Sequence, residues 1–243
     1  MPSRQQVSDM DSQPASGPPA GRNRTPNRAT RLGDRIVMGI ARHWLAIANL
    51  ALFTFIALPF AAPILMRAGM PRAARVFYTI YLPTCHQLPD RSYFLFGDKA
   101  VYTLADLEAA GVLSDTSVLQ RRKYIGDETL GYKVAICERD IAIYGSMLIG
   151  GLMFAVARKR WRIPRLPIGI YVLFLLPIAI DGFSQLFGLR TSNWFLRTVT
   201  GALFGLATIW LTYPYVQESM DDIVLTTEAR LAQETGQIER PGI

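Results

Sequence analysis

Four apolar stretches of about twenty residues each dominate the hydropathy pattern of the chain. They cover residues 44–66, 140–157, 166–187 and 194–216. A helix of about 20 mostly apolar residues crosses the hydrocarbon core of a bilayer, and a spanning segment must close its backbone hydrogen bonds internally. The pattern therefore predicts an all-α, polytopic transmembrane bundle of four spans in a lipid bilayer, with residues 37–216 as its membrane domain.

The remaining segments are predicted to differ in character. Residues 1–36 are rich in Ser, Pro, Gly, Asn and Arg, so they bury too little apolar surface to fold and are expected to form a disordered basic arm. Residues 67–138 are long enough for a small folded insertion between the first two spans. Residues 217–243 form a polar tail, for which a short amphipathic helix at 222–232 and a solvated coil are equally compatible with the sequence.

Within the insertion, local signals predict short elements. The aromatic stretch 76–82 is typical of an amphipathic element at the membrane interface. The sequence Thr-Leu-Ala-Asp at 103–106 is a capping box that opens a short helix through Leu113. Gly126-Asp127 is a turn signal, and residues 132–136 alternate as in a short strand or an extended approach to the next span.

Basic residues predict the orientation of the bundle. Six arginines lie between Arg22 and Arg42, and five cations lie in the loop 158–165. Short cytoplasmic segments carry an excess of Lys and Arg, and two spans separate these two clusters, so both are expected on the cytoplasmic side of the cell membrane. Both termini are then cytoplasmic, and the insertion and the loop 188–193 are extracytoplasmic.

Small residues recur at a spacing of four on two of the spans. Ser146 and Gly150 form one pair, and Gly201 and Gly205 form the other. This spacing lets helix backbones approach closely. It favours internal packing of the bundle over a seam between two copies of the chain.

The polar residues of the predicted topology collect at its outer end. Ionisable residues inside a membrane usually face a bundle interior or a wet cavity, although residues at headgroup depth also serve to anchor helix ends. Residues four apart, such as Asp181 and Gln185, share one helix face. The candidate functional cluster consists of Cys85, His86, Gln87, Cys137, Arg139, Asp140, Asp181, Gln185, Arg190, Asn193 and Arg197.

The two cysteines, Cys85 and Cys137, admit three interpretations. An oxidising outer compartment favours a disulfide. Alternatively, the thiolates, the His86 imidazole and a carboxylate of Asp140 or Asp181 make a tetrahedral site for zinc or another divalent metal. A reversible thiol pair that exchanges with a partner is the third interpretation.

Three sequence blocks resemble a known family. Cys-His-Gln-Leu-Pro-Asp-Arg-Ser at 85–92, Cys-Glu-Arg-Asp at 137–140 and Asp-Gly-Phe-Ser-Gln at 181–185, followed by polar and glycine positions in 188–201, are similar to the uncharacterised prokaryotic membrane proteins of domain of unknown function 2085. The resemblance covers about 75–205. It implies a multi-span membrane protein and no established activity.

No reaction is indicated by the common motifs. The chain has neither a phosphate-binding Gly-Lys-Ser/Thr loop nor a dinucleotide fingerprint, and no Gly-x-Ser-x-Gly elbow. The net charge of +7 follows from the orientation signals, so no nucleic-acid partner is expected. The hypotheses are an outer metal or redox site, a non-catalytic subunit whose disulfide-held outer segment binds a protein partner or a second copy, and a small transporter.

Overall fold

The structure, a computed structural model, describes residues 28–112 and 117–238. The order of the elements along the chain is α1 (Arg28–Arg67), α2 (Pro71–Ile80), η1 (Pro89–Arg91), β1 (Ser92–Leu95), α3 (Leu104–Ala109), α4 (Val118–Lys123), β2 (Gly126–Asp127), β3 (Gly131–Cys137), α5 (Glu138–Ala157), α6 (Ile168–Leu186) and α7 (Trp194–Ile238).

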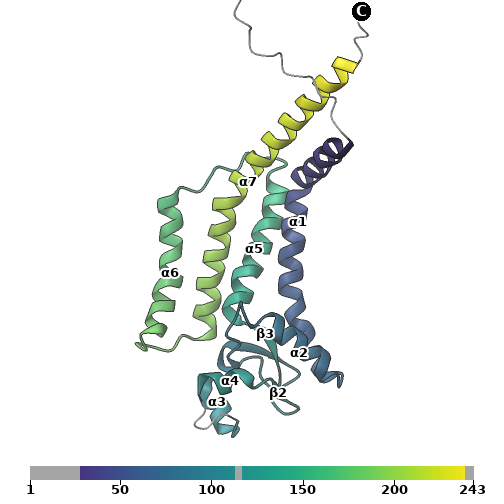
Figure 1. Ribbon diagram of the computed structural model, residues 1–243. Coiled ribbons are helices and arrows are strands. Elements are labelled where there is room, and N and C mark those ends of the chain that lie inside the picture. The colour runs from purple at the N-terminus through teal and green to yellow at the C-terminus, as the bar shows by residue number, and fades with distance from the viewer. Residues whose placement is uncertain (1–27, 113–116, 239–243) are drawn as a thin grey trace, which may run out of the picture.

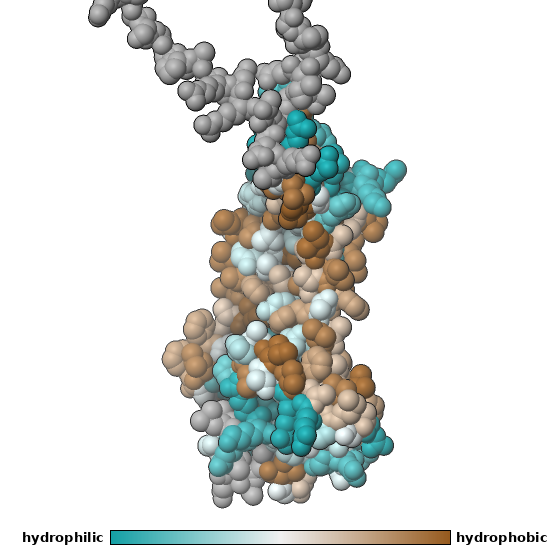
Figure 2. Space-filling view, turned by 45° about the vertical axis from the view of Figure 1, so that its right-hand side comes forward, coloured by the Kyte–Doolittle hydropathy of each residue, from teal (hydrophilic) through white to brown (hydrophobic). Residues whose placement is uncertain are grey.

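The predicted bundle of four spans is confirmed. Helices over Arg31–Arg67, Glu138–Ala157, Ile168–Leu186 and Trp194–Gln233 are long and apolar enough to cross a membrane. Figure 1 shows them side by side, with the short elements of the insertion gathered at one end. Apolar side chains cover the middle of the long helices, while hydrophilic ones gather toward the two ends (Figure 2). This distribution suits a hydrocarbon environment for the middle of the bundle.

The two polar ends of the chain are more helical than the sequence pattern predicts. Helix α1 begins at Arg28, inside the arm that was expected to be disordered, while residues 1–27 of that arm lie outside the described residues. Helix α7 continues past residue 216 to Ile238, where a coil or a short separate helix was expected (Figure 1).

Ion pairs between the two helices explain this difference. Arg42 Nη2 lies 2.5 Å from Glu228 Oε1, and Arg230 pairs with Asp34. Trp44 Nε1 donates a hydrogen bond to Gln217 Oε1 at 3.2 Å. Hydropathy along one helix cannot show that a polar helix face will find its partner on another helix, so both ends were assigned too little helix.

The glycines of α7 allow the closest helix contact of the bundle. Helices α5 and α7 pack along their length, and a Cβ atom on Gly205 would clash with Ser146 Oγ and the carbonyl oxygen of Ile143. A Cβ atom on Gly201 would lie 3.0 Å from the carbonyl oxygen of Arg139. The small residues therefore serve internal packing. Helix α6 packs chiefly on α7 and lies at the outside of the bundle (Figure 1).

The insertion contains a small antiparallel sheet in the order β1-β3-β2. Ser92 pairs with Cys137 and Phe94 with Lys133, with an irregularity between these two pairs. The expected strand at 132–136 is thus confirmed as the central strand β3. Its buried residues 134–136 pack with Tyr78 and Tyr81 against the end of α1.

The other local signals of the insertion have mixed outcomes. The capping box is confirmed, because Thr103 and Asp106 exchange their hydrogen bonds at the start of α3. That helix ends at Ala109, and Leu113, its expected end, lies outside the described residues. Gly126–Asp127 forms strand β2 and the turn follows it, because Asp127 Oδ1 accepts hydrogen bonds from the N–H groups of residues 129 and 130, both at 2.8 Å.

The close approach of α5 and α7 gives a test of the packing. We predict that Gly205→Ala lowers the free energy of unfolding by about 1–3 kcal/mol, because the added methyl group meets backbone that cannot rotate away. Gly145→Ala on α5 is the matched control, since nothing lies within 4 Å of its added Cβ. Thermal unfolding in detergent measures the stability of both variants. Equal losses of stability would contradict the close packing of α5 against α7.

Candidate functional site

A tight turn brings Cys85 to the end of strand β3. Its Sγ atom accepts hydrogen bonds from the backbone N–H of Cys137 at 3.2 Å and of Gln87 at 3.4 Å. Gln87 adopts a φ of 52°, in the left-handed region that non-glycine residues seldom occupy. Its side-chain amide donates to the carbonyl oxygen of Tyr78 at 2.8 Å, which holds the turn against α2.

Three potential metal ligands meet at this turn. The ligand atoms of Cys85, Cys137 and Asp140 all lie within 4.8 Å of one another. Cys137 is the N-cap residue of α5, and Asp140 lies in the first turn of the same helix. Both cysteines are free thiols, so the disulfide interpretation is not realised in this structure.

The surroundings of Cys85 oppose its ionisation. The hydrogen bond with the Cys137 thiol raises the pKa of the Cys85 thiol most, followed by burial and by the proximity of Asp140. The two backbone N–H donors act in the opposite sense, because they stabilise a negative sulfur atom. A positive charge nearby would therefore favour the thiolate form of Cys85.

A cavity of about 180 Å³ adjoins the three ligands. It collects most of the candidate cluster from four separate parts of the chain: the turn after α2, the start of α5, the end of α6 and the start of α7. The cluster residues that line it are Cys85, His86, Gln87, Cys137, Arg139, Asp140, Gln185 and Arg197. His86 lies at its edge, exposed to solvent and outside the close group of three ligands.

Asp181 has a different role from the one predicted as a metal ligand. It is fully buried, and its carboxylate accepts hydrogen bonds from Arg139, from Arg190 at 2.9 Å and from the Ser192 hydroxyl at 3.1 Å. Gln185 donates a further one at 3.1 Å. With its oxygens occupied in this way, Asp181 joins the ends of α5, α6 and the following loop.

A second buried ion pair lies beside the first. Arg197 Nη1 lies 3.0 Å from Glu138 Oε2, and both side chains are almost completely buried. Arg197 also donates to the carbonyl oxygens of Ser192 and Asp90. Asn193 lies outside the cavity and accepts a hydrogen bond from the N–H of Leu196 at 2.8 Å, as a cap for α7.

Sequence analysis missed Glu138, Ser192 and Lys133. Glu138 and Ser192 lie within the sequence blocks that resemble the known family, and only their partners in the structure reveal a role. Lys133 is the largest fully buried side chain in the described residues, and its Nζ donates to the carbonyl oxygens of Gln87 at 2.7 Å and Arg122 at 2.8 Å. Burial lowers its pKa to about 7. No local signal marks it, because Lys133 alternates with the apolar residues of β3 and so falls on the face that the pattern predicts to be polar.

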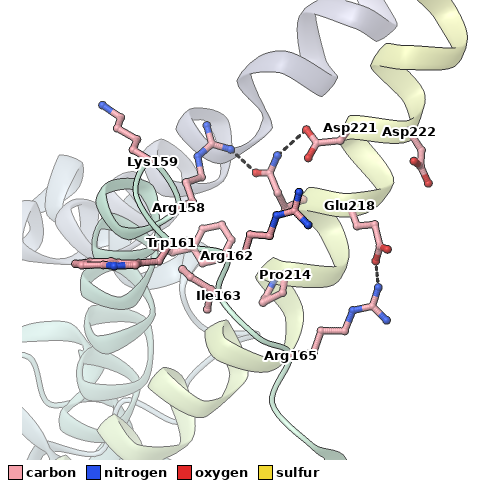
Figure 3. Close-up of a pocket in the computed structure, with 12 residues that line it drawn as sticks. Arg158, Lys159, Trp161, Arg162, Ile163, Arg165, Pro214, Glu218, Asp221 and Asp222 are labelled. Atoms are coloured by element: carbon pink, nitrogen blue, oxygen red, sulfur yellow. Dashed lines mark hydrogen bonds and ion pairs between the residues drawn. The ribbon is translucent and has the colours of Figure 1, made fainter.

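A larger cavity lies at the opposite end of the bundle and contains neither cysteine nor histidine among its lining residues. It has a volume of about 770 Å³ and lies between the loop 158–165 and α7. Figure 3 shows Arg165 paired with Glu218, and Arg158 directed toward the same face of α7. Because this cavity lacks the cysteine and histidine side chains of the candidate cluster, we assign the candidate chemistry to the smaller cavity.

Part of the chain matches a known family of membrane proteins. Residues 128–211 match the family described as "Predicted membrane protein (DUF2085)". The resemblance expected from the sequence blocks is thus confirmed over these residues. The matched part holds Cys137, Asp140 and Asp181, while Cys85 lies before it.

A relative of the chain occurs in an archaeon. The chain is 28% identical over 139 residues to "Uncharacterized protein MJ1492" of Methanocaldococcus jannaschii, which covers 56% of this chain and 66% of the relative. The alignment therefore spans slightly less than two thirds of the relative's length. No solved structure matches the chain.

The ion pairs of Asp181 can be tested by their contribution to the stability of the protein. We predict that Asp181→Asn lowers the free energy of unfolding by about 3–5 kcal/mol, because the change leaves arginines without their buried counterion. Asp98→Asn in the exposed part of the insertion is the control. Thermal unfolding in detergent is the measurement. A loss of stability no larger than that of the control would contradict the stabilising role of Asp181.

The low pKa of Lys133 predicts that the stability of the protein depends on pH. Its folded-state pKa of about 7 lies below the ordinary lysine value of 10.5, so the unfolded chain binds more protons between these values and stability rises with pH there. We predict that the wild type gains stability relative to Lys133→Met by roughly 1 kcal/mol per pH unit in that window.

Unfolding temperatures at pH 6.5 to 10 would report this difference. Lys159→Met, at an exposed lysine of the loop 158–165, is the control and should follow the wild type at every pH. A constant difference between the wild type and Lys133→Met would show that Lys133 is protonated throughout.

Proposed function

We propose that this membrane protein binds a divalent transition metal, with zinc as the best fit, at Cys85, Cys137 and Asp140. The observation that supports it is the convergence of these three ligand atoms within 4.8 Å. Three groups that become anionic on deprotonation repel one another at this distance unless a cation lies between them. Thiolates with a carboxylate suit a borderline-soft ion such as Zn²⁺.

The arginines around the cavity do not replace that cation. Arg139 pairs with Asp181, Arg197 with Glu138, and Arg91 Nε lies 3.6 Å from Asp90 Oδ2. Among the described residues, no ion pair includes Asp140. The positive charge of the cavity wall is thus directed to other carboxylates, which leaves the three ligands in need of a charge of their own.

An open fourth position accompanies the three protein ligands. His86 lies at the cavity edge, where a change of its side-chain rotamer would bring the imidazole toward the metal, and water is the other ligand available. Metal sites with three protein ligands and an open position suit Lewis-acid chemistry or metal transfer, whereas closed sites are structural. The geometry therefore supports metal handling or metal-assisted chemistry.

The site is proposed to face the extracytoplasmic side of the cell membrane. The loop 158–165 follows α5 at the end opposite to Cys137, and its five cations favour the cytoplasm. The start of α1 and the end of α7 lie at that same end (Figure 1). On this orientation the termini are cytoplasmic and the metal would come from the outer compartment.

Metal content tests the proposal. Protein purified from membranes in detergent is expected to hold about one metal ion per chain, and Cys85→Ser, Cys137→Ser or Asp140→Asn should each reduce that content at least tenfold. Asp98→Asn, an exposed carboxylate of the same insertion, should leave it unchanged. Cobalt loaded into the chelated protein should give thiolate-to-metal absorption in the near ultraviolet, which each cysteine variant abolishes.

A chelator should also lower the unfolding temperature of the wild type, because a ligand that binds only the folded state stabilises it. Protein that holds no metal, gives no cobalt absorption and keeps both thiols free would overturn the proposal.

A dithiol that exchanges with a partner disulfide is the second candidate. The position of the two Sγ atoms favours it, since they lie within 4.8 Å of each other. In such an exchange the two thiols would give two electrons and two protons to the partner disulfide and form a bond between Cys85 and Cys137. Alkylation of native membranes separates the candidates, because a redox pair is isolated partly as the disulfide and a metal site yields two free thiols after chelation.

A further inference from the structure

A second cavity lies on the other side of Gln87 from the proposed metal site. It has a volume of about 560 Å³ and is formed by α2, α4 and β3. Four of its lining residues are cations, namely Arg75, Arg122, Lys123 and Lys133, and none is an acid. Gln87 lines both cavities, and its carbonyl oxygen accepts the hydrogen bond from Lys133.

These four basic side chains, of which Lys133 is only partly protonated near pH 7, have no counterion within the described part of the chain. None of them takes part in an ion pair there. Arg122 and Lys133 donate to backbone carbonyl oxygens, and the buried Nε atom of Arg122 has no hydrogen-bond partner. A concave surface lined by one sign of charge concentrates its field. The cavity therefore favours the binding of an anion.

The remaining lining residues indicate that the anion carries an apolar part. Leu82, Ile125 and the ring of Tyr78 contribute apolar surface, and the volume exceeds the needs of a single phosphate group. Helix α2 follows the end of the first span directly, and its residues Val76 and Ile80 expose 54% and 59% of their surface. Such a helix lies at the membrane interface, so the mouth of the cavity is at headgroup depth.

The geometry points to a binding pocket for the headgroup of an anionic phospholipid. The phosphate would lie against Arg122, with Lys133 buried behind it. The cations at the rim, Arg75 and Lys123, would contact it from the solvent side, and the start of the acyl region would rest on Leu82 and Ile125. Basic pockets at the ends of transmembrane helices bind lipid phosphates in this way, and a guanidinium group suits phosphate oxygens geometrically. This assignment does not depend on metal at Cys85.

Binding of a soluble short-chain lipid to the full-length protein tests the assignment. The probes are dihexanoyl phosphatidylglycerol, dihexanoyl phosphatidylcholine and inorganic phosphate, and native mass spectrometry from a non-ionic detergent measures the affinity. The wild type is expected to bind the phosphatidylglycerol at least tenfold more tightly than the phosphatidylcholine.

Variants at the rim keep the fold and remove the charge. Arg75→Gln and Lys123→Gln should each weaken phosphatidylglycerol binding roughly fivefold, the effect of one cation near a phosphate. Arg72→Gln is the matched control, because Arg72 is exposed on the same helix and does not line the cavity.

Three results would overturn the assignment: equal binding of the two lipids, equal losses in the rim variants and Arg72→Gln, or inorganic phosphate that competes as well as the lipid at the same concentration. The last result would assign the cavity to a free anion.

Discussion

Two carboxylates buried at one end of the apolar bundle determine how the neighbouring helices are positioned. Glu138 and Asp181 are fully buried, and a buried charge without a partner costs several kcal/mol. Each has its arginine on a different part of the chain: Arg197 of α7 pairs with Glu138 of α5, and Arg139 of α5 pairs with Asp181 of α6. These pairs fix how far each helix is shifted along its neighbours, so they also fix the first turn of α5.

The first turn of α5 carries the candidate chemistry. Cys137 and Asp140 flank Glu138 and Arg139, so the residues that pair with the neighbouring helices lie between two of the candidate metal ligands. Strand β3 runs directly into this turn and brings Cys85 to it through the N–H of Cys137. A short apolar strand, two ion pairs and one strained turn are thus enough to assemble ligands that lie 52 and 55 positions apart from Cys85 in the chain.

The sequence predicted the parts of this structure that depend on local patterns. The four spans follow from apolar length, and the strand at 132–136 follows from alternation. The candidate cluster was found because its members are polar residues near span ends, and eight of its eleven members line one cavity.

The parts that depend on distant partners were not predictable from one chain position at a time. The roles of Asp181 and Asn193 were interpreted as functional because their partners, two arginines and a backbone N–H, could not be foreseen. The helical ends of α1 and α7 were missed for the same reason, since the pair of Asp34 and Arg230 joins residues 196 positions apart. Lys133 was missed because a lysine in an alternating strand is ordinarily solvated.

A double-mutant cycle on Glu138 and Arg197 tests most directly whether paired buried charges hold the site together. The free energy of unfolding is measured for the wild type, Glu138→Gln, Arg197→Gln and the double variant. If the pair acts as described, each single change costs about 3–5 kcal/mol, and the double variant loses less than the sum by about 1–3 kcal/mol. Losses that add within about 0.5 kcal/mol would show that the two side chains are independent and would contradict the account.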